Sequence, residues 1–309
     1  MNSLFCLCYE IFQFFFFFCY VSGTPGAIFK ENSTVLLHGT RRTDVFGLGS
    51  PGHVVVVGPQ EFVVYNHVNP TDYYIDLPHD GFVGLRLPTP ANHLPPGYGA
   101  GANPIWLRMM DQGLLRRNVF SLYLREFNLR GSQGSHIMFG GVDRNAYLGR
   151  IRYYGLVEDA YKWIIHMQTV CVAGHEQFWW FKAEIDSGSK YIYGPYEIIN
   201  AINRQILDRE VPLHETALLT NEELAVSDNF REVRFTFGGG DENHVFNLLP
   251  QHYICEDEDV PDRYSTVFRP RVFEPEQEPC FTLGLPWLRR YHTTFDFGQR
   301  RIGFARSVV

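Results

Sequence analysis

An aspartate in a tight Ser-Gly turn is the feature of this sequence best suited to chemistry. Asp186 is followed by Ser187, Gly188 and Ser189, and it comes shortly after the aromatic stretch Phe178–Phe181. A carboxylate in such a turn can act as a general acid or base, or it can hold the turn together by accepting backbone N–H groups. Which role it has depends on whether a second carboxylate stands opposite it.

The composition indicates a folded protein with a mildly acidic surface. The chain has 309 residues, of which 45% are hydrophobic, 16% aromatic and 20% charged, and its net charge is -7. This length suffices for one large domain or two lobes with their own cores, and the apolar content argues against disorder. No long basic block is present, so we expect no nucleic-acid partner. The absence of CxxC, HxxxH and HExxH spacings leads us to expect no metal site.

Two cysteines of the body form a candidate cross-link. Cys255 and Cys280 flank an acidic, proline-rich insertion, whose run Glu256–Asp259 we interpret as a solvated loop. A disulfide between them could close the insertion and would imply an oxidising compartment. Two separate thiols are the alternative. Cys171 lies in an apolar segment and is expected to pack as a small hydrophobic side chain.

Residues 1–27 form a hydrophobic leader. The apolar run from Ile11 to Val21 is too short to span a bilayer, so we expect no stable membrane span, but it fits a signal-peptide core. A signal would deliver the chain to the secretory pathway, extracellular or lysosomal, where Asn32 in Asn-Ser-Thr is a glycosylation sequon. No Lys or Arg precedes the run, and five consecutive Phe residues would also arise from translating a pyrimidine-rich intron end. A gene-model artefact is therefore the alternative.

The body of the chain is typical of an all-β protein. Short apolar runs bounded by Gly, Pro and polar residues predict strands, and helical spacing is confined to a few segments. The predicted strands are Thr34–Leu37, Val54–Val57, Phe62–Tyr65, Val119–Leu124 and His136–Phe139, with a turn at His38–Thr40. The predicted helices are Ile105–Gln112, Glu197–Leu207 and Trp287–Tyr291.

In their order and spacing, several segments resemble the pepsin-like aspartic endopeptidases. The stretch from Asp186 to Ser189 resembles the second Asp-Thr/Ser-Gly turn of that family, and Tyr193-Gly194-Pro195 follows at the family spacing. Further similar segments are Asp80–Leu85, Asp111–Leu114, Phe139–Asp143, Leu283–Gly284 and Ile302–Ala305. The similarity extends over nearly the whole body of the chain.

The resemblance implies an all-β, bilobal acid protease fold. An incomplete N-terminal lobe with its flap would cover residues 28–157, and a complete C-terminal lobe residues 158–309. The family uses one Asp from each lobe, because two carboxylates about 3 Å apart share a proton and together activate water. The resemblance thus assigns Asp186 as catalytic and Ser187, Gly188 and Ser189 as support for the turn. It also implies peptide or protein substrates, no metal or cofactor, and a monomer.

The first Asp-Thr/Ser-Gly turn of the family is missing from this sequence. The first 34 residues contain no Asp, and the flap-like segment Val35–Thr40 begins shortly after the leader. His38 stands where the family has its flap Tyr, and Gly39 and Thr40 follow. We therefore expect the chain as written to be inactive as a peptidase. Two main interpretations stay open: an endopeptidase whose sequence is N-terminally incomplete here, and a non-catalytic homologue that binds peptides in the retained groove. A third, weaker one is self-association, in which two copies each offer Asp186.

Three residues around the remaining turn depart from the family pattern. Glu184 stands where the family usually buries an apolar residue, two positions before the Asp. Thr282 replaces an apolar residue in the stretch that supports the turn, and Leu285 stands where an Asp is common. Each departure affects the fine geometry of the site rather than the fold.

Overall fold

The computed structural model of the chain describes residues 27–31, 35–50, 53–69, 83–88, 103–125, 134–158, 162–172, 175–177, 180–212, 215–239, 242–257, 260–273 and 278–308. The leader before residue 27, the sequon residue Asn32 and the segment around Asp80 lie outside the described residues.

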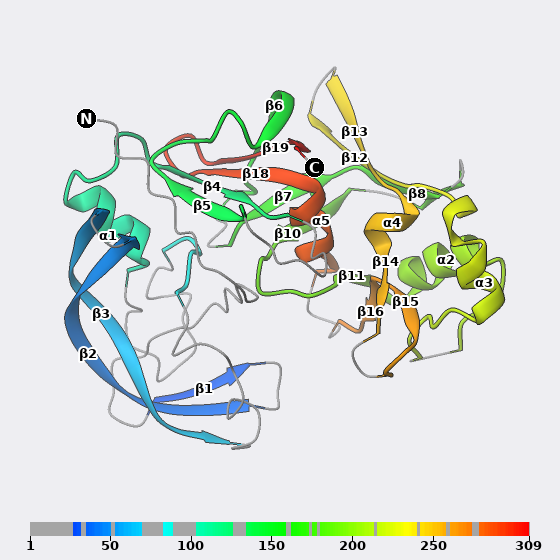
Figure 1. The fold of residues 1–309 in the computed structure, drawn as a ribbon, viewed down its shortest axis with the longest axis horizontal. Helices are drawn as coiled ribbons and strands as arrows, with labels where there is room; N and C mark the ends of the chain where they lie inside the picture. The colour runs from blue at the N-terminus through cyan, green and yellow to red at the C-terminus, as the bar shows by residue number, and fades with distance from the viewer. Residues whose placement is uncertain are drawn as a thin grey trace.

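Strands make up most of the described structure, so the all-β prediction is confirmed. A five-stranded sheet of order β5-β4-β18-β19-β6 lies between a long hairpin at one end of the molecule and helices α2 and α3 at the other (Figure 1). Its strands are β4 (Val119–Tyr123), β5 (His136–Phe139), β6 (Tyr147–Gly155), β18 (Tyr291–Asp296) and β19 (Arg301–Ser307). The last two strands of the chain thereby pair with β4 and β6, which come far earlier in the sequence.

A second five-stranded sheet, of order β16-β11-β17-β10-β7, carries the candidate catalytic turn. Its strands are β7 (Ile164–Met167), β10 (Phe181–Ile185), β11 (Ile192–Pro195), β16 (Phe268–Arg271) and β17 (Cys280–Leu283). A four-stranded sheet of order β13-β12-β8-β9 adjoins it. That sheet contains β8 (Thr169–Val172), β9 (His175–Gln177), β12 (Val233–Gly239) and β13 (Glu242–Leu248), and a separate pair is formed by β14 (Ile254–Glu256) and β15 (Tyr264–Thr266).

Helices are few and short. They are α1 (Ile105–Asp111), α2 (Tyr196–Leu207), α3 (Asn221–Ala225), α4 (Pro250–Tyr253) and α5 (Leu285–Arg290), with a 3-10 turn at Ser227–Asn229. The three helices expected from sequence correspond to α1, α2 and α5, with ends that differ by no more than two residues. On α2, Ile199, Ile202 and Ile206 are buried because their spacing of three and four residues keeps them on one face.

The long hairpin differs from the sequence-based expectation. β1 (Ala27–Glu31), β2 (Val35–Ser50) and β3 (His53–Asn69) form a three-stranded antiparallel sheet. The turn predicted at His38–Thr40 is wrong, because this backbone is extended and pairs with β3, with a register shift between His38 and Gly39. The two strands predicted around Gly58-Pro59 are likewise one strand, which accommodates these two residues at a second register shift, opposite Val45.

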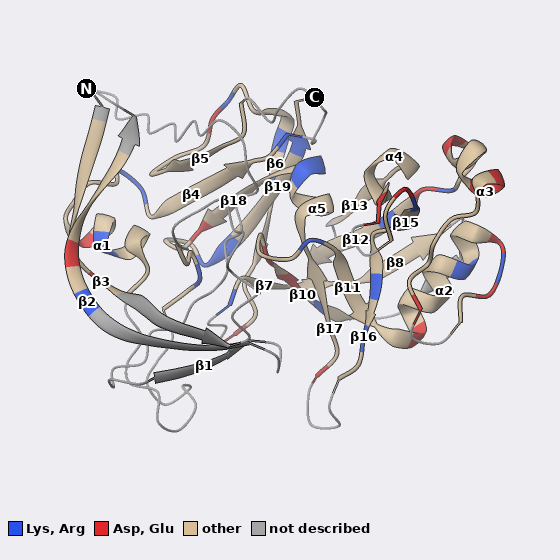
Figure 2. Cartoon of the chain, turned by 60° about the horizontal axis from the view of Figure 1, so that its bottom comes forward, with Lys and Arg blue, Asp and Glu red and all other residues tan. Residues whose placement is uncertain are grey.

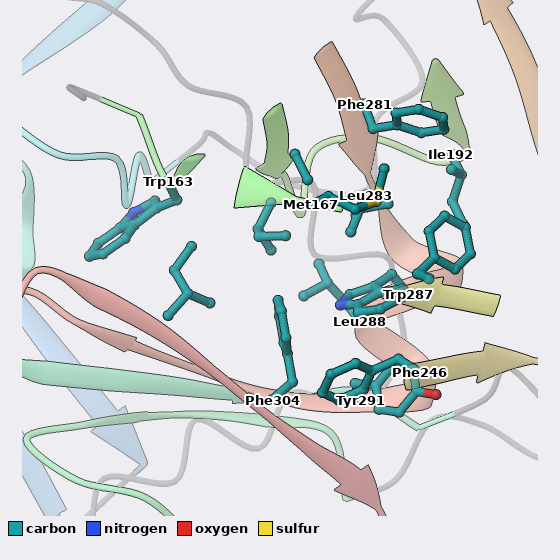
Figure 3. Close-up of a cluster of buried hydrophobic side chains, with 14 of the residues drawn as sticks. Trp163, Met167, Ile192, Phe246, Phe281, Leu283, Trp287, Leu288, Tyr291 and Phe304 are labelled. Carbon is teal, nitrogen blue, oxygen red and sulfur yellow. The ribbon is translucent and has the colours of Figure 1, made fainter. Parts of the chain in front are cut away.

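The core between the sheets is built from aromatic rings. Trp287 of α5 is fully buried and contacts Phe237 of β12, Phe246 of β13 and Phe304 of β19 with centroid distances of 5.6, 5.8 and 5.2 Å (Figure 3). Rings in edge or tilted contact contribute beyond the area they bury. This cluster joins α5, which directly follows β17, to both the four-stranded sheet and the β18–β19 pair.

Candidate active site

The interior strand β10 positions Asp186. It runs parallel to β17 on one side and antiparallel to β7 on the other. Ala183 and Ile185 of β10 are buried to 0% and 1% exposure, and the N–H of Ile185 donates to the carbonyl of Trp163 at 2.9 Å. Because both neighbours of β10 hold it by backbone hydrogen bonds, the residue that follows Ile185 has a fixed position.

The turn after β10 is closed by the Asp186 side chain. Oδ1 of Asp186 accepts the N–H of Gly188 at 2.9 Å, and its backbone carbonyl accepts the N–H of Ser189 at 3.3 Å. The N–H of Asp186 donates to the carbonyl of Leu283 at 3.2 Å, which ties the turn to the end of β17. A side-chain oxygen that accepts the N–H two residues on is the Asx-turn geometry. The carboxylate itself is half-buried, whereas Ser187 and Ser189 are buried.

Gly284 lies against this turn. A Cβ on Gly284 would lie 2.2 Å from the carbonyl oxygen of Ser189 and 2.3 Å from that of Tyr191. Both contacts are to backbone atoms, which cannot rotate away, so only glycine fits at this position. The N–H of Leu285 then donates to the carbonyl of Ser189 at 2.8 Å. The Leu283–Gly284 segment predicted to support the turn therefore contacts it directly.

Three departures from the family pattern are accommodated locally. Thr282 and Leu285 are buried, with exposures of 5% and 8%. Glu184 pairs across the sheet with Thr282, and its Oε2 accepts a hydrogen bond from Nζ of Lys162 at 3.0 Å. The Glu184 side chain is only 13% exposed, so the cation offsets part of the cost of burying this carboxylate.

The disulfide predicted between Cys255 and Cys280, which would close the acidic insertion, is absent from the structure, and this prediction is wrong. Cys255 lies on β14 opposite Ser265, whereas Cys280 begins β17 opposite Lys182 in a different sheet. The Sγ of Cys280 donates to the carbonyl of Phe281 at 3.2 Å. Burial, together with the negative charge of Glu184, raises the pKa of the Cys280 thiol to about 11.

Sequence reasoning missed a buried arginine behind the turn. Arg269 of β16 donates from Nη2 to Asp257 Oδ2 at 3.1 Å and to Ser265 Oγ at 2.8 Å. Its guanidinium also lies 4.2 Å from the ring centroid of Tyr191, whose carbonyl accepts the hydroxyl of Ser189 at 3.2 Å. Asp257 is 2% exposed, so the interpretation of the whole acidic run as solvated is wrong at this residue.

The remaining predicted site residues lie apart from these contacts or outside the described part. The backbones of His38, Gly39 and Thr40 form part of β2, where His38 pairs with His67; their side chains are not described, and a flap role for them stays a prediction. Among the described residues, no group of three or more His, Cys, Asp or Glu side chains is arranged to hold a metal ion. No helix within the described ranges has the length and apolarity needed to cross a bilayer.

Comparison with known proteins agrees with this geometry. A sequence model of the family described as eukaryotic aspartyl protease matches residues 37–307. Cathepsin D of Bos taurus is 28% identical over 247 residues, which are 76% of this chain and 57% of that protein. Gastricsin of Callithrix jacchus is 28% identical over 259 residues, 82% of this chain and 61% of that protein. Pregnancy-associated glycoprotein 2 of Bos taurus is 29% identical over 244 residues, which are 75% of this chain and 56% of that protein. The chain thus spans less than two thirds of the length of these relatives.

Proposed function

This chain belongs to the eukaryotic aspartyl protease family, and on that premise we propose that Asp186 is one of the two aspartates of a pepsin-like endopeptidase site. The observation that carries the proposal is the position of Asp186 in an Asx turn whose backbone is in close contact with Gly284. The turn is held by backbone hydrogen bonds and by the Asp186 side chain itself. A half-buried carboxylate held in this way is suited to position a water molecule or a scissile carbonyl.

The proposed chemistry needs a second carboxylate. When two carboxyl groups stand about 3 Å apart, they cannot both ionise, so one keeps a proton. The ionised group takes a proton from the attacking water, and the protonated group donates a hydrogen bond to the substrate carbonyl oxygen. The roles reverse when the tetrahedral intermediate collapses and the amine leaves. Asp186 alone supplies only one of the two carboxyl groups that this mechanism needs.

We propose further that the 309-residue chain by itself does not hydrolyse peptide bonds. It contains one Asp-Thr/Ser-Gly triplet, at Asp186, and its first Asp of any kind is Asp44. A partner aspartate in the same kind of turn would have to come from sequence outside these residues. Peptide or protein substrates follow from the family and belong to the same proposal.

The test is a cleavage assay of the purified chain at acid pH, with and without a transition-state-analogue inhibitor of the family. We expect no turnover. Turnover that the inhibitor blocks would contradict the proposed inactivity and would place the second carboxylate within this chain. Sequencing the 5′ end of the transcript is the companion experiment. If an upstream Asp-Thr-Gly exon exists, the extended protein should cleave peptides and its Asp186→Asn variant should not.

The second candidate function is a non-catalytic homologue that binds peptides in the retained groove. It is favoured by Glu184, which stands two residues before Asp186, where the family usually has an apolar residue. The Glu184 carboxylate is ion-paired with Lys162. Saturable binding of the labelled inhibitor to a protein that shows no turnover, even when extended by any upstream exon, would support this candidate. Turnover by the extended protein would reject it.

Three further points stay proposals. They are the division into an N-terminal lobe (28–157) and a C-terminal lobe (158–309), the monomeric state, and delivery to the secretory pathway. The sheet containing β4, β6, β18 and β19 draws strands from both sides of the proposed boundary, so we expect a break after residue 157 to leave two fragments that stay associated. The apolar leader and the sequon at Asn32 support secretion. A glycosidase-sensitive mobility shift that Asn32→Gln removes would test it.

A further inference from the structure

A pocket of about 370 Å³ lies beside β6, an edge strand of the five-stranded sheet that also contains β4, β18 and β19. Four arginines line it: Arg117 before β4, Arg144 before β6, Arg150 on β6 and Arg301 on β19. Its volume falls within the range of small-molecule sites. The name arginine pocket is used below for this cavity and these four residues.

Among the described residues, no carboxylate lines the arginine pocket. Arg117, Arg144 and Arg150 are exposed and make no ion pair within the described part of the chain. Arg301 donates from Nε to Asp296 at 2.9 Å, a contact that uses one edge of its guanidinium. The pocket is therefore a local concentration of positive charge on a chain whose net charge is -7. Figure 2 shows basic residues along β6 and β19, whereas acidic residues gather around α2 and α3.

Two carboxylates near the pocket offset part of its positive charge, because Asp296 is ion-paired with Arg301 and Asp143 precedes Arg144 in the chain. Asp143, next to Arg144, is engaged elsewhere, because its Oδ2 lies 3.4 Å from Nε2 of His136 and its Oδ1 accepts the N–H of Asn145 at 2.9 Å. Like charges around one cavity repel one another and raise the energy of the empty site. An anion that screens them would relieve this repulsion.

A second observation points independently to a ligand. Tyr147 lines the pocket and is only 7% exposed, yet its hydroxyl has no hydrogen-bond partner in the described structure. A buried hydroxyl without a partner costs free energy, and it normally signals a missing acceptor. Tyr153 also lines the pocket, and the guanidinium of Arg301 lies 3.9 Å from its ring centroid. This stacking fixes the plane of the guanidinium.

We propose that the arginine pocket binds a multivalent oxyanion, with a phosphate or sulfate ester group seated between Arg144 and Arg150 and within reach of Arg301. Guanidinium groups present paired N–H donors that match the spacing of oxygens on these esters. In this proposal the Tyr147 hydroxyl supplies a neutral donor to the same group. The pocket is separate from the turn that carries Asp186, and its binding does not depend on proteolysis.

The experiment is isothermal titration of the full chain at fixed ionic strength with two probes. Inositol hexakisphosphate represents phosphate esters and sucrose octasulfate represents sulfate esters, so the two titrations distinguish the sources of the oxyanion. We expect saturable binding of at least one probe. The variant Arg144→Ala/Arg150→Ala should weaken it tenfold or more, and Tyr147→Phe should weaken it severalfold.

The matched control is Arg204→Ala/Arg231→Ala, which removes the same charge from exposed positions on α2 and before β12. We expect its affinity to stay within twofold of the parent chain. If both double variants lose affinity for the probe equally, binding reflects general charge attraction and the proposal is overturned. Failure of both probes to bind saturably would overturn it as well. The four arginines altered in the double variants are exposed, whereas Tyr147 is buried. Thermal unfolding of each variant checks that the fold is intact.

Discussion

The backbones of Ser189 and Gly284 are in such close contact that a Cβ on residue 284 would lie 2.2 Å from the Ser189 carbonyl oxygen. The same oxygen accepts the N–H of Leu285 at 2.8 Å. The turn that presents Asp186 is therefore held by the chain that follows β17, and its geometry depends on the absence of a side chain at residue 284.

We expect Gly284→Ala to lower the free energy of unfolding by about 3 kcal/mol or more, because backbone atoms would have to move to admit the methyl group. Urea denaturation of the purified variant measures this. The control is Gly155→Ala on β6, where an added Cβ meets no atom within 4 Å. A similar loss in both variants would show that the close contact with Ser189 does not decide the effect.

The two roles of Asp186 can be separated by two substitutions. Asp186→Asn keeps a carbonyl oxygen to accept the N–H of Gly188, so we expect its stability to change by less than about 0.5 kcal/mol. Asp186→Ala removes the acceptor and should cost about 1 kcal/mol. Equal stability of the two variants in chemical denaturation would contradict a turn-forming role for Oδ1.

The sequence predicts most of what is local in this fold. Helix α2 was expected at Glu197–Leu207 because its apolar residues recur every three to four positions, and it begins at Tyr196. Strands β4 and β5 are predicted from short apolar runs, and the turn at Asp186 is predicted from its Asp-Ser-Gly sequence. These features depend on neighbours within a few residues, and sequence patterns carry such information well.

The errors arose where distant segments decide the outcome. Gly39 suggests a turn, but pairing of β2 with β3 holds it in an extended strand. Cys255 and Cys280 flank one insertion, yet separate sheets carry them. Asp257 belongs to an acidic run, and only the fold reveals that Arg269 covers it. The arginine pocket likewise collects residues from four segments, none of which is unusual alone.

The buried pair Arg269–Asp257 yields a stability prediction. Arg269→Met would leave the Asp257 carboxylate, whose side chain is 1% exposed, without its cation. We expect a loss of roughly 3–5 kcal/mol, because a buried charge without a counter-charge is costly. The double variant Arg269→Met/Asp257→Asn removes that charge and should recover most of the loss in denaturant unfolding. If the double variant is no more stable than Arg269→Met, the cost lies in packing against Tyr191 and not in the charge.

The thiols give a chemical prediction. Under denaturing, non-reducing conditions, iodoacetamide should alkylate the peptides that contain Cys255 and Cys280, as peptide mass mapping would show. In the native protein at neutral pH, Cys280 should react slowly, because burial and Glu184 raise its pKa to about 11. Glu184→Gln removes one of these causes and should speed the native reaction. Recovery of both peptides as one unalkylated cross-linked species would restore the disulfide and contradict the structure.

Two histidines with lowered pKa values, the buried His292 and the partly buried His252, make the fold sensitive to acid. His292 on β18 is 0% exposed, and neither of its ring nitrogens has a partner among the described residues. Burial and the nearby His136 lower the pKa of His292 from 6.5 to about 4, against the opposing charge of Asp143. Burial also lowers the pKa of His252 to about 4, and its neutral Nδ1 accepts the N–H of Leu249 at 2.9 Å.

The last prediction follows from the sign of these shifts. Each folded-state pKa lies below the unfolded value near 6.5, so the unfolded chain binds protons first as the pH falls. The stability that neutral His292 contributes is therefore complete above about pH 6.5 and is lost as the pH falls towards 4, by about 3 kcal/mol at most, at about 1.4 kcal/mol per pKa unit. His292→Leu should flatten the dependence of unfolding free energy on pH in this window relative to the parent chain. Parallel curves for the parent chain and His292→Leu would contradict the prediction, and they would mean that buried water or a rearranged side chain solvates the imidazolium in the folded protein.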